Sequence, residues 1–79
     1  MDGSGFVVWL TDLMEREGLT GEMVAQEIGV SGGHVSNLLL GKRRPGYKVF
    51  SGLWGAYPAE REAILRLWFP EELREVAEL

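Results

Sequence analysis

The chain has 79 residues, 46% of them hydrophobic, with no cysteine, one histidine and a formal net charge of -4. This length predicts one domain near the lower limit for folding without a cross-link. The lack of cysteine excludes a disulfide and a thiolate-bound metal. No apolar run approaches the ~20 residues of a membrane span, and the acidic start does not resemble a secretory signal, so we expect a cytoplasmic protein without a membrane segment.

No phosphate-binding glycine loop, metal-ligand cluster or carboxylate pair suited to acid–base chemistry is present in the sequence. We therefore expect no enzymatic activity, no metal and no cofactor.

Apolar residues recur at three- and four-residue spacing along most of the chain, which predicts an all-α fold. The expected helices cover residues 6–17, 21–28, 31–40 and 46–56, and a fifth begins at Pro58, a favourable first-turn residue. Pro70 interrupts the pattern and allows a short sixth helix, with Leu73, Val76, Ala77 and Leu79 as its apolar set.

The segment from Leu19 to Pro45 carries the clearest local signals. Thr20 is a suitable cap for one short helix, Gly29 suits its end, and Ser31 can cap the next helix at once. Two helices separated by a tight glycine turn are typical of a helix-turn-helix.

Basic residues concentrate directly after the third helix. Four of the eight lysines and arginines lie within residues 42–48: Lys42, Arg43, Arg44 and Lys48. The overall acidity argues mildly against a nucleic-acid partner, but phosphate binding is a local property of a surface. We expect these side chains to contact phosphates; the alternative is a solvated basic loop.

The outer side of the third helix offers few side chains that could read bases. Asn37 is the best candidate because its amide can form a pair of hydrogen bonds with adenine, and His34 and Ser36 are the remaining candidates. Gly32 and Gly33 have no side chain, so we expect their backbone N–H groups to approach phosphates closely. The alternative is that sequence reading has been lost at this surface.

The chain resembles the helix-turn-helix domains of the Cro/C1 phage-repressor type, also called the XRE family. The residues that carry the resemblance are Leu10, Leu13, Gly18-Leu19-Thr20, Ala25, Ile28-Gly29-Val30-Ser31, Val35-Ser36, Gly41-Lys42-Arg43 and Pro45, with a weaker match at Leu53 and Tyr57.

The resemblance implies a lambda-repressor-like bundle of five helices, with residues 1–57 as the core and 58–79 as a helical extension. It also implies a homodimeric transcription regulator that binds double-stranded DNA with its third helix in the major groove, with Thr20 among the phosphate-binding residues. This sequence departs from the pattern at Gly21, where members often carry a glutamine that contacts a phosphate, and at the glycine pair.

Three consecutive large apolar residues, Leu67, Trp68 and Phe69, cannot all face inward on one helix. They are the candidates for a dimer contact. A second functional hypothesis is that the fold binds a protein partner, as in an antitoxin, with weak or no DNA binding. The overall acidity, the glycine pair and the leucines at 38–40 favour that hypothesis.

Overall fold

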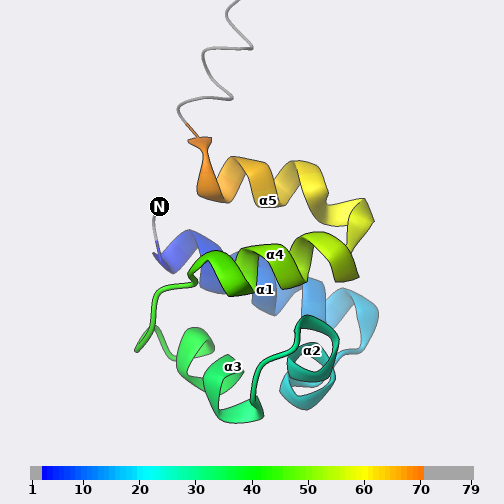
Figure 1. The fold of residues 1–79 in the computed structure, drawn as a ribbon, viewed down its shortest axis with the longest axis vertical. Coiled ribbons are helices and arrows are strands. Elements are labelled where there is room, and N and C mark those ends of the chain that lie inside the picture. The colour runs from blue at the N-terminus through cyan, green and yellow to red at the C-terminus, as the bar shows by residue number, and fades with distance from the viewer. Residues whose placement is uncertain (1–2, 71–79) are drawn as a thin grey trace, which may run out of the picture.

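The computed structural model describes residues 3–70, which form five α-helices and one short 3-10 helix and, within that range, no strand (Figure 1). The elements are α1 (Gly3–Glu17), α2 (Gly21–Ile28), α3 (Gly32–Leu39), α4 (Tyr47–Ala56), η1 (Pro58–Glu60) and α5 (Arg61–Trp68). None of these helices is long and apolar enough to cross a membrane. The predicted sixth helix after Pro70 lies outside the described residues.

The ends of α2 and α3 are fixed by the residues that the sequence indicated. The Thr20 hydroxyl oxygen accepts a hydrogen bond from the Met23 backbone N–H at 3.2 Å, and the Ser31 hydroxyl oxygen accepts one from the His34 N–H at 3.1 Å. Each bond satisfies a donor that the first helical turn leaves unpaired. The turns after α1, α2 and α3 contain glycines at positive φ: Gly18 (65°), Gly29 (76°) and Gly41 (73°).

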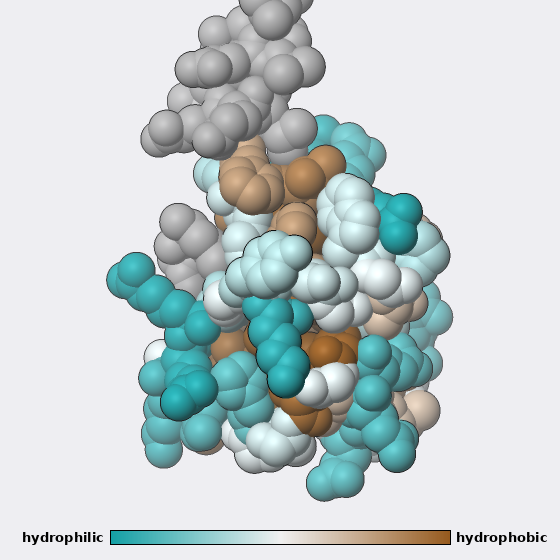
Figure 2. Space-filling model, viewed as in Figure 1, coloured by the Kyte–Doolittle hydropathy of each residue, from teal (hydrophilic) through white to brown (hydrophobic). Residues whose placement is uncertain are grey.

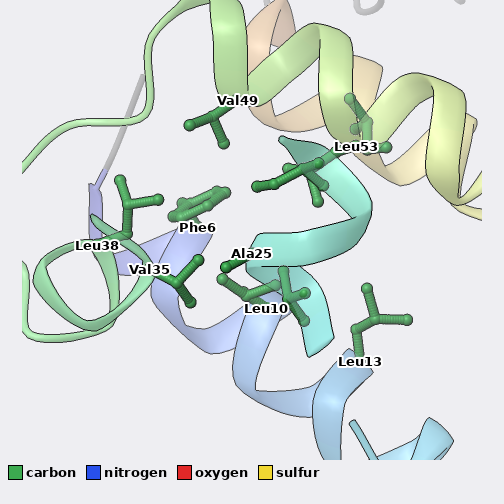
Figure 3. Packing of buried hydrophobic residues seen from close by; sticks show 11 residues of the cluster. Phe6, Leu10, Leu13, Ala25, Val35, Leu38, Val49 and Leu53 are labelled. Carbon is green, nitrogen blue, oxygen red and sulfur yellow. The ribbon is translucent and has the colours of Figure 1, made fainter. Parts of the chain in front are cut away.

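One apolar cluster joins all five α-helices. Figure 3 shows side chains from α1, α2, α3 and α4 converging on a common centre, where Phe6 and Leu10 of α1 face Ala25 of α2. Ile64 of α5 is also fully buried. The buried members of this cluster are Phe6, Leu10, Leu13, Val24, Ala25, Ile28, Val35, Leu38, Val49, Leu53 and Ile64.

The end of α2 lies directly against α4 at Gly52. A Cβ atom built on Gly52 would lie 2.6 Å from both the Ile28 Cβ and the Ile28 carbonyl oxygen. Carbon atoms normally approach to about 3.5–4.0 Å, so only glycine allows this separation. Because Ile28 immediately precedes the α2–α3 turn, this contact also sets where α3 lies relative to α4.

The α5 helix is held to α1 by aromatic packing and by one carboxylate. The Trp68 ring meets the Phe6 ring edge to face, with 5.6 Å between centroids. Glu60 accepts hydrogen bonds from Trp9 Nε1 at 3.1 Å and from Arg16 Nη2 at 3.2 Å. The start of α1 and the end of α5 consequently lie side by side (Figure 1).

Two expected helix starts are wrong, and two side chains have surroundings that the sequence pattern does not indicate. The first helix begins at Gly3 rather than Phe6, and residues 58–60 form a 3-10 turn before α5. Met23 is 43% exposed because it lies on the capping turn, where its sulfur is 3.5 Å from the Thr20 nitrogen. Glu60 does not face solvent, since it is drawn inward by the Trp9 indole and the Arg16 guanidinium.

Candidate functional site

The α2 and α3 helices are joined by only three residues and pack against each other, which leaves one side of α3 facing outward. Val35 and Leu38 point into the core. Helical spacing then places four residues along the outer strip of α3. Within this strip Asn37 is half-buried and the others are exposed: Gly33, Ser36 and Leu40. The strip is narrow and bears no long polar side chain.

The basic loop of residues 42–48 borders this strip. Lys42, Arg43, Arg44 and Lys48 are all exposed, and none forms an ion pair with another residue between 3 and 70. Figure 2 shows hydrophilic side chains gathered on the side of the molecule where the α3–α4 loop lies in Figure 1. The positive charge of the loop is therefore available to an external anion.

The loop and α3 also meet in one shallow depression, the polar hollow, of about 470 Å³. Its polar lining comes from both ends of the segment: Ser31, His34, Arg43, Arg44, Tyr47 and Lys48. Arg43 Nη1 lies 3.4 Å from His34 Nδ1, which links the loop directly to α3. Three cationic side chains, the His34 imidazole and two hydroxyl groups thus converge on this hollow, which is a chemistry suited to an anion.

A carboxylate lies beside the predicted phosphate-contacting glycines. A Cβ built on Gly32 would be 3.0 Å from Glu22 Oε1, so the Glu22 side chain reaches the start of α3. A negative charge is favourable at a helix N-terminus, and it opposes the approach of a phosphate to the same place. Gly33, one position further along, has only Ser31 Oγ near it, at 4.0 Å, and is open to solvent.

The structure places the remaining predicted site residues in two groups. Asn37, Ser36 and His34 all lie on α3. Within residues 3–70 the side-chain amide of Asn37 forms no hydrogen bond, whereas its backbone carbonyl accepts one from the Lys42 N–H. Thr20 lies at the start of α2, where its oxygen already serves as the helix cap; its hydroxyl proton is free to be donated.

The three dimer candidates have different surroundings. Leu67 and Trp68 are half-buried against their own chain's core, and Phe69 is 41% exposed, with its ring edge-on to Phe50 at 5.9 Å. Hydrophobic side chains over α5 are visible at the surface in Figure 2. Of the three, Phe69 offers the most surface to a second copy.

Glu22 and Tyr47 near α3 were not found by sequence reasoning, and Leu40 was considered only as part of the apolar 38–40 segment. Glu22 is an ordinary acidic first-turn residue in the sequence, and only the packing of α2 against α3 brings it to Gly32. Tyr47 is 81% exposed and lines the polar hollow. Leu40 is 67% exposed, because it follows the buried turn of α3 as the C-cap.

Comparison with known proteins found no match, whether to a family model, to a curated protein or to a solved structure. The function of this site is therefore argued from its own geometry and charge.

Proposed function

We propose that this protein is a small double-stranded-DNA-binding regulator with a lambda-repressor-like helix-turn-helix fold. In this proposal α3 lies in the major groove and the 42–48 loop contacts the flanking phosphates. The observation that carries it is the exposed basic loop adjoining the outer strip of α3, which forms no ion pair within residues 3–70 and in which Arg43 contacts His34. A short capped helix with a basic exit loop is the arrangement by which such domains engage a groove and its backbone.

The short side chains of the outer strip favour close backbone contact over extensive base reading. Gly33 and Ser36 let the α3 backbone come near the DNA, and Asn37 is the side chain with the right chemistry for adenine. Affinity in this arrangement comes mainly from counterion release at the basic loop. With about four phosphates neutralised per subunit, the log–log salt slope is about −3.6 per subunit and roughly −7 for a dimer.

The experiment is a fluorescence-anisotropy titration of the chain with random and genomic duplexes at salt concentrations from about 50 to about 200 mM. Arg43→Ala and Arg44→Ala should weaken binding to all sequences alike and make the salt slope shallower by about 1 each. Arg66→Ala is the matched control, because Arg66 is exposed on α5 and, among residues 3–70, pairs only with Glu62. No binding at the lowest salt would refute the proposal and favour the partner-binding hypothesis.

Selection of bound fragments from a random duplex library tests specificity and stoichiometry together. Asn37→Ala should change the preference at one base pair by about 1–3 kcal/mol. A dimer bound through Phe69 gives two half-sites at a fixed spacing. A monomeric mass at high protein concentration and single half-sites in the selected fragments would contradict the dimer.

A further inference from the structure

A second depression lies on the other side of the basic loop and has a different lining. Its walls are mostly apolar, from the first turns of α1 and the end of α3: Val7, Val8, Leu39 and Leu40. Its volume is about 480 Å³, and Val8 and Leu40 are 70% and 67% exposed. We refer to it as the apolar hollow.

Arg43 and Arg44 line both hollows. Neither forms an ion pair with another described residue. A ligand that combines apolar side chains with carboxylates would fill the apolar hollow and neutralise the same two arginines that face the polar hollow. Such a ligand would compete with any anion bound on the polar side.

Residues 71–79, which lie outside the described part, have this combination of properties. They contain four glutamates and one arginine, and Leu73, Val76 and Ala77 share the i, i+3, i+4 spacing of one helical face. Their charge is therefore complementary to the rim of the apolar hollow, and their apolar residues are complementary to its walls.

The place where the described chain ends is also close to this hollow. A Cβ built on Gly5 would lie 3.7 Å from Leu67 Cδ2, so the last turn of α5 packs on the first turn of α1. Val8 is one helical turn further along α1 and forms a wall of the hollow. Nine residues extend up to about 30 Å, which is ample for a path that starts beside α1.

We propose that residues 71–79 of this chain dock in the apolar hollow and pair with Arg43 and Arg44, so that the tail and DNA compete for the basic loop. The docking itself is independent of the proposed function; only its consequence for DNA rests on that function. The competition reduces the apparent DNA affinity by the fraction of chains in which the tail is docked.

Docking is tested first without DNA. The chain has no cysteine, so Glu78→Cys provides a unique position for a spin label in the 79-residue chain. We expect the label to broaden the NMR signals of Val8 and Leu40 at low salt, and the broadening to disappear in an Arg43→Gln, Arg44→Gln variant. Sharp signals for Val8 and Leu40 in the labelled parent would overturn the proposal.

A mixed sample separates this chain's tail from that of another copy. Spin-labelled chains without isotopes are added to isotope-enriched chains without a label. If the Val8 and Leu40 signals are broadened in the mixture as strongly as in chains that carry both isotopes and label, a second copy supplies the tail. That result would overturn docking within one chain. Sharp signals in the mixture support it.

The consequence for DNA is tested by replacing Glu71, Glu72 and Glu75 with glutamine. We expect at least about fivefold tighter binding at low salt, which is within the usual range of coupling between sites. The matched control removes three exposed carboxylates elsewhere, at Glu15, Glu17 and Glu62. An equal gain in DNA affinity in both variants would mean that only net charge matters and would overturn the competition. If the Val8 and Leu40 signals are broadened but the protein binds no DNA, the proposed function is refuted and docking of the tail stands.

Discussion

Replacing Gly52 by alanine gives the most direct test of how α2 and α4 pack. The added Cβ would lie 2.6 Å from two atoms of Ile28 and 2.9 Å from its Cα. These distances are about 1 Å shorter than a normal contact. Two of the three atoms belong to the backbone, so a change of side-chain rotamer cannot relieve the clash and the helices must separate.

The magnitude follows from two opposing effects. Overpacking of a well-packed core costs typically 1–3 kcal/mol, occasionally more, and backbone contacts place Gly52→Ala at the upper end. Alanine returns up to about 1 kcal/mol through its better helix propensity. We expect a net loss of about 2 kcal/mol, equivalent to a fall in Tm of roughly 8–16 °C for a domain of this size.

Gly55→Ala is the matched control on the same helix. A Cβ on Gly55 meets nothing within 4 Å, so this variant should gain up to about 1 kcal/mol. Urea unfolding followed by circular dichroism measures both variants, with unchanged m-values expected. If Gly52→Ala proved as stable as Gly55→Ala, the close α2–α4 contact would be wrong, and with it the placement of α3 beside the basic loop.

Three further predictions concern single side chains. Glu22→Gln should tighten DNA binding several-fold at low salt, with the gain fading at high salt, because a carboxylate beside Gly32 repels phosphate. Glu60→Ala should destabilise the fold by about 1–2 kcal/mol in urea unfolding, and Glu60→Gln by less than about 1, since the amide oxygen still accepts the Trp9 indole proton. Burial, together with the nearby Glu27 carboxylate, raises the pKa of Tyr57, so the unfolded chain ionises first and stability falls as the pH rises above about 10. Tyr57→Phe should remove this pH-dependent part of the free energy of unfolding, whose slope is less than about 1.4 kcal/mol per pH unit because the ring is only partly buried. A difference in stability between the two proteins that stays the same at every pH would contradict the prediction.

The features that the sequence predicted well are the ones set by neighbouring residues. Thr20 and Ser31 cap the helices that follow them, and Gly29 ends α2 at a positive φ. Each of these depends on a hydrogen bond or dihedral angle within a few positions, so periodicity and capping rules were sufficient.

Contacts between distant residues could not be predicted in this way. Glu60 meets Trp9 across 51 positions, and its spacing on a helix gives no sign of that partner. Gly52 is an unremarkable helical glycine until Ile28 is placed against it. The approach of Glu22 to Gly32 likewise depends on the angle between α2 and α3, so the carboxylate at the candidate site emerged only from the fold.

The glycine pair at the start of α3 raises a question that the fold itself does not answer. Neither Gly32 nor Gly33 has a positive φ, and a Cβ on either would meet only the end of the Glu22 side chain or the Ser31 hydroxyl. Glycine weakens a helix by up to about 1 kcal/mol relative to alanine, and by less in the first turn. Unlike Gly52, these two glycines are therefore not required by the packing of residues 3–70.

One reason for glycine at these positions is that a second molecule approaches the start of α3 closely. We expect Gly33→Ala to stabilise the fold by up to about 0.5–1 kcal/mol and at the same time to weaken DNA binding several-fold, because the methyl group keeps phosphate away from the backbone N–H groups. Unfolding and anisotropy measured on the same preparation separate the two effects. If Gly33→Ala gains stability and binds DNA as tightly as the parent, close approach at this position is wrong, and base contacts from Asn37 together with the basic loop must supply the binding.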